Sequence, residues 1–326
     1  MSATTMGSAG AMISPENELS DATPLIRRPL DLTGRAVLLA TDGSPCSVAA
    51  TRVAYALAKQ QHAVVHVVSM VDTRVAPIPP PLDVALAMGD ALAGPELRRE
   101  KESAVRAELS GALGEPIAWP VRVMLGIPAD GIVQEAAHIG AVLIVVGLRR
   151  HGRMDRARHD ETTLNLMRAT ACPVLGVVAE QDDLPRRVLA AIDFSSGSLR
   201  ALRAGRAIAG PSASLVLAYV QRANGFIAEE GDATIHELGV QAGFAKIAHE
   251  IGGGGIRFDH VVLHNAPPQS TAQALLEYAD DVRCDLITAG SVHHSRFDRW
   301  LLGSVSTELV RDGRRSVLIV PPRREG

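Results

Sequence analysis

The chain has 326 residues, of which 47% are hydrophobic and 21% are charged. At about 150 residues per domain, this length and composition predict two globular domains rather than a disordered chain. The 33 Lys and Arg residues nearly balance the 36 Asp and Glu residues, and the net charge of −3 argues against a dedicated nucleic-acid binder, which carries a large basic excess. Aromatic residues make up only 3%, so side chains on which bases or sugars stack are scarce.

Neither a membrane segment nor an export signal is visible in the sequence. The longest strongly apolar run, Ala141 to Val146, is far too short to span a bilayer. The first twenty residues lack the basic start and apolar core of a secretory signal. Cys46, Cys172 and Cys284 form no CxxC pair or zinc spacing, and their odd number gives no disulfide framework. We therefore expect a soluble, cytoplasmic protein with reduced thiols and no membrane partner.

The chain repeats itself after about half its length. Residues 1–34 are rich in Ser, Ala, Thr, Pro and Asp without a sustained period, which predicts a mobile tail. A short apolar run then ends in Asp42, and a second ends in Asp193, 151 residues later. Ser-rich turn residues and an Ala/Leu spacing suited to a helix follow each aspartate. An internal repeat explains this correspondence most simply.

Further strands and helices alternate along each half. In the first half the expected strands after the aspartate are 63–71, 118–125, 141–147 and 172–178, and the expected helices are 95–113 and 128–139, with one more before the last strand. In the second half the corresponding strands are 214–220, 256–264, 285–290 and 316–322, and the helices are 229–251 and 267–281. The helices expected over 128–139 and 267–281 each open with a proline, which suits the first turn.

Strands that alternate with helices and are apolar almost throughout indicate a parallel sheet covered on both faces. The sequence therefore predicts an α/β fold of two doubly wound, Rossmann-like, five-stranded parallel-sheet domains in tandem, over 35–180 and 186–326, with the seam near 180–185. Ligands bind such sheets at the carboxyl ends of the strands, around the switch point. This rule brings each aspartate and the loop after the fourth strand to one crevice.

A proline-rich segment, 73–94, interrupts the first half. Its run VAPIPPPLDVALAMGD fits neither a helix nor a central strand, so we expect a loop. This loop is either a lid or partner contact, or a solvated insertion.

Small and polar residues gather where the second crevice is expected. Gly290 ends the fourth strand, and Gly303-Ser304 begin a helix 13 residues later. Glycines allow backbone amides to approach a ligand, a helix N-terminus favours an anion, and a serine hydroxyl caps a helix or donates to a phosphate. Across the crevice, Asp193 suits a ribose hydroxyl or a metal ion bound to phosphates.

With these residues the sequence resembles the universal stress protein family in tandem form, over about residues 35–322. The family pattern is a strand-ending Asp and, after the fourth strand, G-x-x-G, nine residues and G-[ST]; GSVHHSRFDRWLLGSV (290–305) fits it closely. Members with the full pattern bind adenine nucleotides and others do not. The resemblance implies that Asp193 meets the ribose or metal and that Ala218 lines the adenine site by its backbone. It also implies that Gly290, Gly303, Ser304 and Val305 cradle the phosphates.

The second half departs from the family pattern at His293, which replaces the second glycine. This side chain either crowds the phosphates or attracts them as an imidazolium, and the nearby His294, Arg296 and Arg299 favour attraction. Adjacent His293 and His294 diverge, and no third ligand is evident, so we expect no metal bound by this pair.

The first half departs further from the pattern. Arg150 stands at the second glycine, and Asp160-Glu161 replace G-[ST]. Carboxylates at a helix start suit its dipole but repel polyphosphate by about 1–4 kcal/mol per close charge. We therefore expect ordinary ATP binding to be lost in this half. The Arg-rich loop 148–159 either pairs with these carboxylates in solution or reaches a partner or an anionic effector.

The leading function is a stress-response regulatory protein that binds an adenine nucleotide, ATP foremost, with or without Mg²⁺, in the C-terminal half and acts on an unidentified protein partner. The alternative is a tandem scaffold without nucleotide. Enzymatic activity beyond slow ATP hydrolysis is not expected, since neither an SGGxDS loop nor a G-x-S-x-G elbow occurs. The family resemblance also implies that edge strands 172–178 and 316–322 pair as an internal pseudo-dimer, with a further homodimer open.

Overall fold

The computed structural model describes residues 31–72, 94–148, 159–210, 212–222, 230–251, 257–291, 302–312 and 314–322. The elements of the first half are β1 (Ala36–Thr41), α2 (Pro45–Gln61), β2 (Val64–Asp72), α4 (Gly94–Leu113), β3 (Val121–Gly126), α5 (Pro128–His138), β4 (Leu143–Gly147), α6 (His159–Ala169) and β5 (Val174–Val177). Those of the second half are β6 (Arg187–Ala191), α7 (Ser196–Ile208), β7 (Ser214–Arg222), α8 (Glu230–Ile251), β8 (Arg257–Asn265), α9 (Thr271–Asp281), β9 (Leu286–Gly290), α10 (Ser304–Asp312) and β10 (Ser316–Val320).

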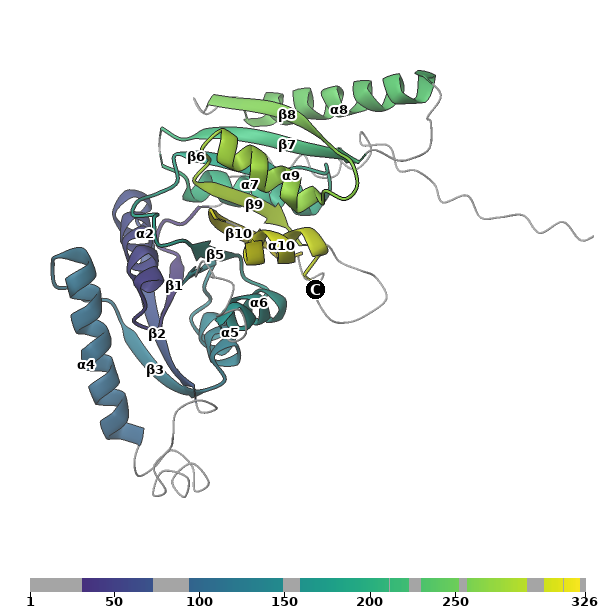
Figure 1. Cartoon of the computed structure of the whole chain (residues 1–326). Helices are drawn as coiled ribbons and strands as arrows, with labels where there is room; N and C mark the ends of the chain where they lie inside the picture. The colour runs from purple at the N-terminus through teal and green to yellow at the C-terminus, as the bar shows by residue number, and fades with distance from the viewer. Residues whose placement is uncertain are drawn as a thin grey trace, which may run out of the picture.

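The strands form one ten-stranded sheet in the order β3-β2-β1-β4-β5-β10-β9-β6-β7-β8, which runs through both halves in Figure 1. Within each half all neighbouring strands are parallel. From the seam outward, the order is β5-β4-β1-β2-β3 in the first half and β10-β9-β6-β7-β8 in the second. The two halves therefore have the same strand order. The predicted α/β fold of two doubly wound five-stranded sheets is confirmed.

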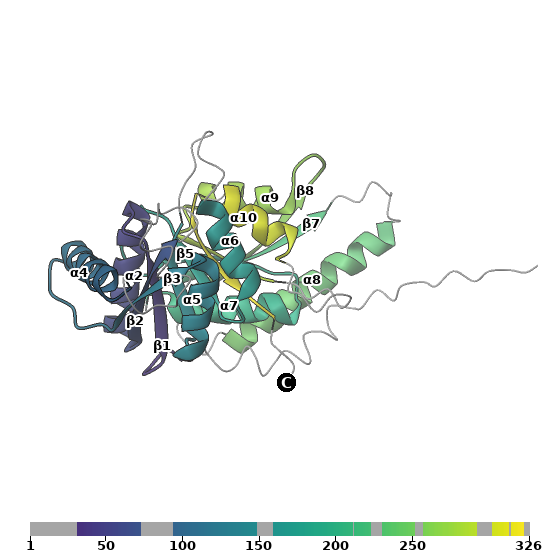
Figure 2. The ribbon, with the colours of Figure 1, turned by 90° about the horizontal axis from the view of Figure 1, so that it is seen from below.

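The two halves join through their edge strands, β5 and β10, which pair antiparallel. Leu318 lies opposite Leu175, with one further rung on each side. The predicted internal pseudo-dimer is thereby confirmed, and α6 and α10 lie side by side across the seam in Figures 1 and 2. Both strands are shorter than predicted: β5 starts directly after Pro173 and β10 stops before Pro321, because proline has no N–H to donate to a ladder.

Helices cover both faces of the sheet, so the molecule has two cores. On one face the buried apolar residues of α2, α4, α7 and α8 pack against the strands. On the other face those of α5, α6, α9 and α10 do so. Since both faces are covered, the carboxyl ends of the strands are where a parallel sheet has room for a ligand.

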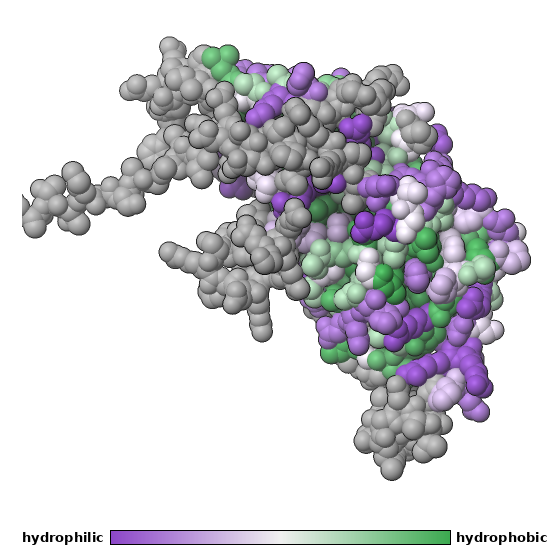
Figure 3. Space-filling model, turned by 180° about the vertical axis from the view of Figure 1, so that it is seen from behind, coloured by the Kyte–Doolittle hydropathy of each residue, from purple (hydrophilic) through white to green (hydrophobic). Residues whose placement is uncertain are grey.

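Large apolar side chains that stay exposed are scattered among the described residues, for example Val64, Ile127 and Leu238. Figure 3 shows hydrophilic and hydrophobic residues intermixed over the described part of the rear face. Within that part of the chain, no helix is long and apolar enough to cross a membrane. Of the proline-rich segment 73–94, only Gly94 is described, as the first residue of α4.

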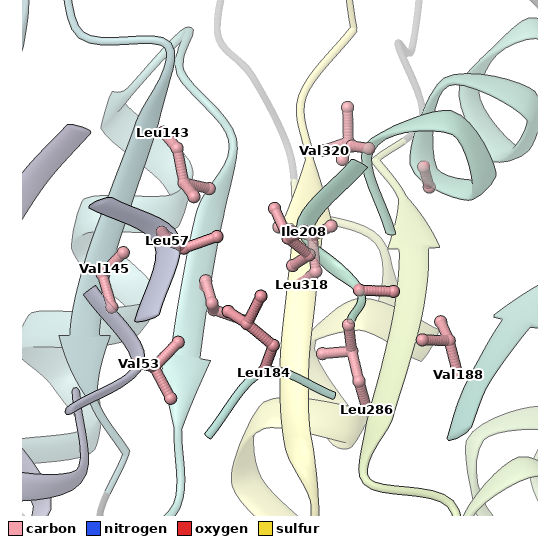
Figure 4. Close-up of a cluster of buried hydrophobic side chains, with 14 of the residues drawn as sticks. Val53, Leu57, Leu143, Val145, Leu184, Val188, Ile208, Leu286, Leu318 and Val320 are labelled. Atoms are coloured by element: carbon pink, nitrogen blue, oxygen red, sulfur yellow. The ribbon is translucent and has the colours of Figure 1, made fainter. Parts of the chain in front are cut away.

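The segment between the halves also contributes to the core. Leu184, which is 2% exposed, packs in the same cluster as Val53 and Leu57 of α2 and Ile208 of α7, as Figure 4 shows. Gln61 adds a side-chain hydrogen bond from Nε2 to the Ala209 carbonyl, 3.3 Å long. Burial of these apolar side chains thus stabilises the contact between the two halves in addition to the β5–β10 ladder.

Two further differences from the sequence predictions concern the start of a helix and the end of the predicted tail. The helix expected from Pro267 begins at Thr271, because Ser270 caps the helix in a capping box with Gln273. At the other end of the chain, Leu32, which was predicted to belong to the tail, is 2% exposed and part of the core.

The thiols of Cys172 and Cys284 are expected to resist alkylation in the folded protein. Burial raises the pKa of Cys172 to about 12 and, as the largest cause, that of Cys284 to about 11. At pH 8 the reactive thiolate is therefore depleted relative to the unfolded chain, and we expect iodoacetamide to react at least about 100-fold more slowly. Peptide mass spectrometry with and without urea measures both rates; equal rates would contradict the burial.

Candidate functional site

Asp193 is held at the end of β6 by the turn that starts α7. Its Oδ1 accepts hydrogen bonds from the Ser195 amide at 3.0 Å and from the Ser195 hydroxyl at 2.6 Å. Ser195 is in turn the N-cap of α7 and accepts from the Ser198 amide at 3.2 Å. The carboxylate is exposed, so the turn fixes its position while leaving it open to a ligand.

The buried side chain of Phe194 holds this turn in place. Its φ of 62° is unusual for a bulky residue, and its ring is 2% exposed. The ring packs on Tyr219 and Phe244, each with centroids 5.5 Å away. Gly243 of α8 makes room, because a Cβ there would lie 2.5 Å from the ring. Burial first, and the Asp193 charge second, raise the pKa of Tyr219, as expected where the phenol lies close to the carboxylate.

Replacing Gly243 with Ala is expected to destabilise the second half by about 1–3 kcal/mol, because the new methyl group meets the buried Phe194 ring. Gly239→Ala on the same helix is the matched control: nothing described lies within 4 Å of its Cβ position, so better helix propensity should stabilise it by up to about 1 kcal/mol. Urea unfolding measures both changes. Equal stabilities of the two variants would contradict this packing.

Gly290 is required by the packing of β9 on α7. A Cβ on Gly290 would lie 2.4 Å from the Gly197 carbonyl carbon and 2.8 Å from the Ser198 amide nitrogen. The start of α7, which carries the cap below Asp193, therefore touches the end of β9. This contact fixes the end of β9 against the start of α7.

The start of α10 is the helix end that the sequence predicts across the crevice from Asp193. The carbonyl of Gly303 accepts from the Thr307 amide at 2.9 Å, so Gly303 caps the helix, and nothing described lies within 4 Å of its Cβ position. Ser304 is exposed, whereas Val305 packs on the core. The first turn of α10 holds no acidic residue, so its positive end is available to an anion.

Ala218 lies deeper in the sheet than a ligand-lining residue needs. It is 1% exposed, and its carbonyl accepts from the Ile192 amide at 2.8 Å. Its rung with Ala191 is the last between β6 and β7. Val220 lies two residues further along β7, so its backbone groups point in the same direction as those of Ala218. It lies beyond the end of β6, where no described strand pairs with it on that side. The sequence analysis did not single out this position. His293 lies outside the described residues, as do its neighbours His294, Arg296 and Arg299.

The first half has a differently built crevice. Asp42 accepts from the Ser44 amide at 2.9 Å and the Ser47 hydroxyl at 2.5 Å, much as Asp193 does. Beside it, Glu108 of α4 accepts from the Thr41 hydroxyl at 3.1 Å. Burial is the largest cause that raises the pKa of Glu108, and the Asp42 charge adds to it.

The residue after the aspartate packs against the long helix in both halves, but the large residue and the glycine are reversed. Where the second half packs Phe194 against a glycine of α8, the first half places Gly43, at φ 85°, with its Cβ position 3.0 Å from the Glu108 carboxylate. This second carboxylate is one that sequence reasoning missed, because α4 gave no motif. At the far side, Asp160 and Glu161 fall in the first turn of α6, but their side chains, like Arg150 and most of the loop 148–159, are not described.

No group of three or more His, Cys, Asp or Glu side chains that could hold a metal occurs among the residues whose placement is described. The described residues assigned to the site of the second half carry backbone amides, the Ser304 hydroxyl and the Asp193 carboxylate. Such groups suit a ligand that carries both an anionic group and hydroxyls.

The chain is similar to one protein family and to several solved structures. The model of the universal stress protein family matches twice, over residues 34–177 and 185–321. A universal stress protein from Archaeoglobus fulgidus DSM 4304 is 18% identical, with 88% of this chain and 98% of that chain covered and a TM-score of 0.60. A protein of unknown function from Pseudomonas aeruginosa PAO1 is 14% identical, with coverages of 91% and 94% and a TM-score of 0.58.

A universal stress protein in complex with cAMP is 27% identical, with coverages of 42% and 97% and a TM-score of 0.33. Curated proteins gave no match. The two long structural matches are below 25% identity and bear on the fold alone. The double family match, in contrast, spans most of the chain.

Proposed function

The chain belongs to the universal stress protein family, and we propose that its C-terminal half binds an adenine nucleotide, ATP foremost, as the input of a stress-response regulatory protein. The observation that carries this proposal is the start of α10. There a glycine cap has open space at its Cβ position, and the first turn holds no acidic residue. An anion stabilises such a helix end.

Each group of the crevice has a role in this proposal. The amides at the start of α10 and the Ser304 hydroxyl bind the phosphates. The Asp193 carboxylate, which accepts its two described hydrogen bonds at Oδ1, offers Oδ2 to a ribose hydroxyl. Where Mg²⁺ accompanies the phosphates, the same carboxylate is a suitable oxygen ligand. The residues assigned to the site are Asp193, Gly290, His293, Gly303, Ser304 and Val305; Ala218 is left out because it is 1% exposed and its carbonyl already accepts from the Ile192 amide.

The N-terminal half is proposed to bind no nucleotide and to act through the pseudo-dimer or a protein partner. Two features of its crevice support this. Glu108 adds a carboxylate next to Asp42, and Asp160 and Glu161 fall in the first turn of α6. A polyphosphate in this crevice would therefore meet several like charges.

The nucleotide content of protein purified without added nucleotide tests the proposal. After denaturation, mass spectrometry is expected to find about one adenine nucleotide per chain, and titration calorimetry of the emptied protein with ATP, ADP and cyclic AMP identifies the preferred ligand. Two nucleotides per chain would contradict the proposal for the N-terminal half. Neither released nucleotide nor any heat of binding would leave the scaffold without nucleotide as the function.

A further inference from the structure

An arginine of α7 reaches the edge of the candidate crevice. Arg200 lies in the second turn of the helix and is half-buried. Its Nη1 donates to the hydroxyl of Ser196, the first residue of α7, at 3.2 Å. Long side chains on a helix point toward its N-terminus, and the start of α7 follows the carboxyl end of β6. The guanidinium therefore lies at the edge of the sheet where a parallel sheet binds ligands.

The guanidinium also lies close to both segments of the proposed site. The Cβ position of Gly197 is 3.8 Å from Nη2 of Arg200. The same point is 3.4 Å from the Ser195 hydroxyl and 3.5 Å from the Ser291 carbonyl oxygen. Ser195 donates to the Asp193 carboxylate, and Ser291 directly follows the last residue of β9. A cation thus stands where the turn of the aspartate meets the end of β9.

A small apolar residue takes this place in the first half. Ser47 and Ser198 each accept from the amide of the crevice aspartate in their half, so they align the two helices. Two residues later stands Ala49 in the first half and Arg200 in the second. Ala49 is 2% exposed and packs in the core. Since the first crevice also carries the carboxylate of Glu108, the two crevices differ in the sign of their additional charge.

A guanidinium attracts a ligand more strongly the more negative charge the ligand brings close to it. ATP carries several negative charges along its phosphate chain, whereas cyclic AMP carries a single one. We propose that Arg200 selects nucleotides that have a polyphosphate chain: its guanidinium binds a phosphate beyond the first, which cyclic AMP lacks. This phosphate replaces the neutral hydroxyl of Ser196 as the acceptor, and hydrogen bonds between charged groups are the stronger kind. The inference rests on the proposed nucleotide function.

Titration calorimetry of the emptied full chain with ATP and cyclic AMP tests the inference. The unchanged protein is expected to bind ATP at least about tenfold more tightly than cyclic AMP. Arg200→Gln is expected to weaken ATP binding about tenfold or more and cyclic AMP binding at most about threefold, because a contact between opposite charges is lost. Arg200→Lys keeps the charge and should weaken ATP binding less than Arg200→Gln does.

Arg203→Gln is the matched control. It removes the same charge from the same helix, about one turn further from the crevice, and should change ATP affinity at most about twofold because salt screens a charge that does not contact the ligand. Added salt should also weaken ATP binding less in Arg200→Gln than in the unchanged protein. Thermal unfolding verifies that each variant is folded.

The outcomes separate this inference from the proposed function. If the unchanged protein binds ATP but Arg200→Gln weakens this binding no more than Arg203→Gln does, only the role of Arg200 is overturned. If the unchanged protein binds cyclic AMP as tightly as ATP, the inference is overturned as well. If it binds no adenine nucleotide at all, the proposed function fails and phosphate selection fails with it.

Discussion

Gly303→Asp is expected to remove detectable binding of ATP, with a loss of about 100-fold or more, and to leave the fold intact. The fold tolerates the change because nothing described lies within 4 Å of the Cβ position, and a carboxylate at a helix start stabilises it by about 0.3–1 kcal/mol. The same carboxylate repels a phosphate at the α10 start by about 4 kcal/mol at a separation near 4 Å. Titration calorimetry and thermal unfolding measure the two effects separately.

Gly303→Asn is the matched control, because asparagine has the size of aspartate and caps a helix equally well without the charge. We expect it to cost at most about tenfold in ATP affinity. If both variants weaken binding equally, the side chain obstructs the ligand and charge is not the cause. Unchanged binding in Gly303→Asp would place the phosphates away from α10 and contradict the proposed site.

The layout of the fold was predictable from the sequence because it rests on local and periodic signals. Apolar runs bounded by turn residues located all ten strands to within a few residues, and the repeat of Asp42 and Asp193 predicted two equivalent halves. The start of α9 was predicted wrongly, because Pro267 suggested a first turn while the capping box at Ser270 decides where the helix begins. Short-range hydrogen bonds thus overrode the proline signal.

Contacts between distant segments could not be predicted in the same way. Glu108 approaches Thr41 across 67 residues, and Gly243 faces Phe194, yet neither α4 nor α8 carries a motif that relates it to a crevice. The position of the Arg200 guanidinium near the end of β9 is visible only once α7 and β9 are placed. The motif residues Gly290 and Gly303 were found from the sequence, but their spacing did not reveal that the first is enclosed by backbone and the second is open.

Gly290→Ala is expected to destabilise the protein by about 3 kcal/mol or more. Its Cβ would lie 2.4 Å from a backbone carbon of α7, and backbone cannot move aside as the end of a flexible side chain can, so β9 and α7 must separate. Gly197→Ala is the control on the other side of this contact. Its Cβ would find its nearest neighbours at 3.4 and 3.5 Å, which is ordinary contact, so its stability should change by less than about 1 kcal/mol.

Gly147→Ala extends this prediction to the first half and separates packing from ligand binding. A Cβ there would lie 2.7 Å from the Cys46 carbonyl carbon, so urea unfolding should show a loss similar to that of Gly290→Ala, although no nucleotide is expected in that crevice. Helix–strand packing then requires a glycine at this strand end in both halves, whether or not a nucleotide binds. Gly303 has no glycine counterpart in the first half, where Asp160-Glu161 stand in place of Gly303-Ser304. The difference between the halves at this helix start, rather than the glycine they share, is therefore what bears on the nucleotide. A Gly147→Ala protein as stable as the parent would contradict this distinction.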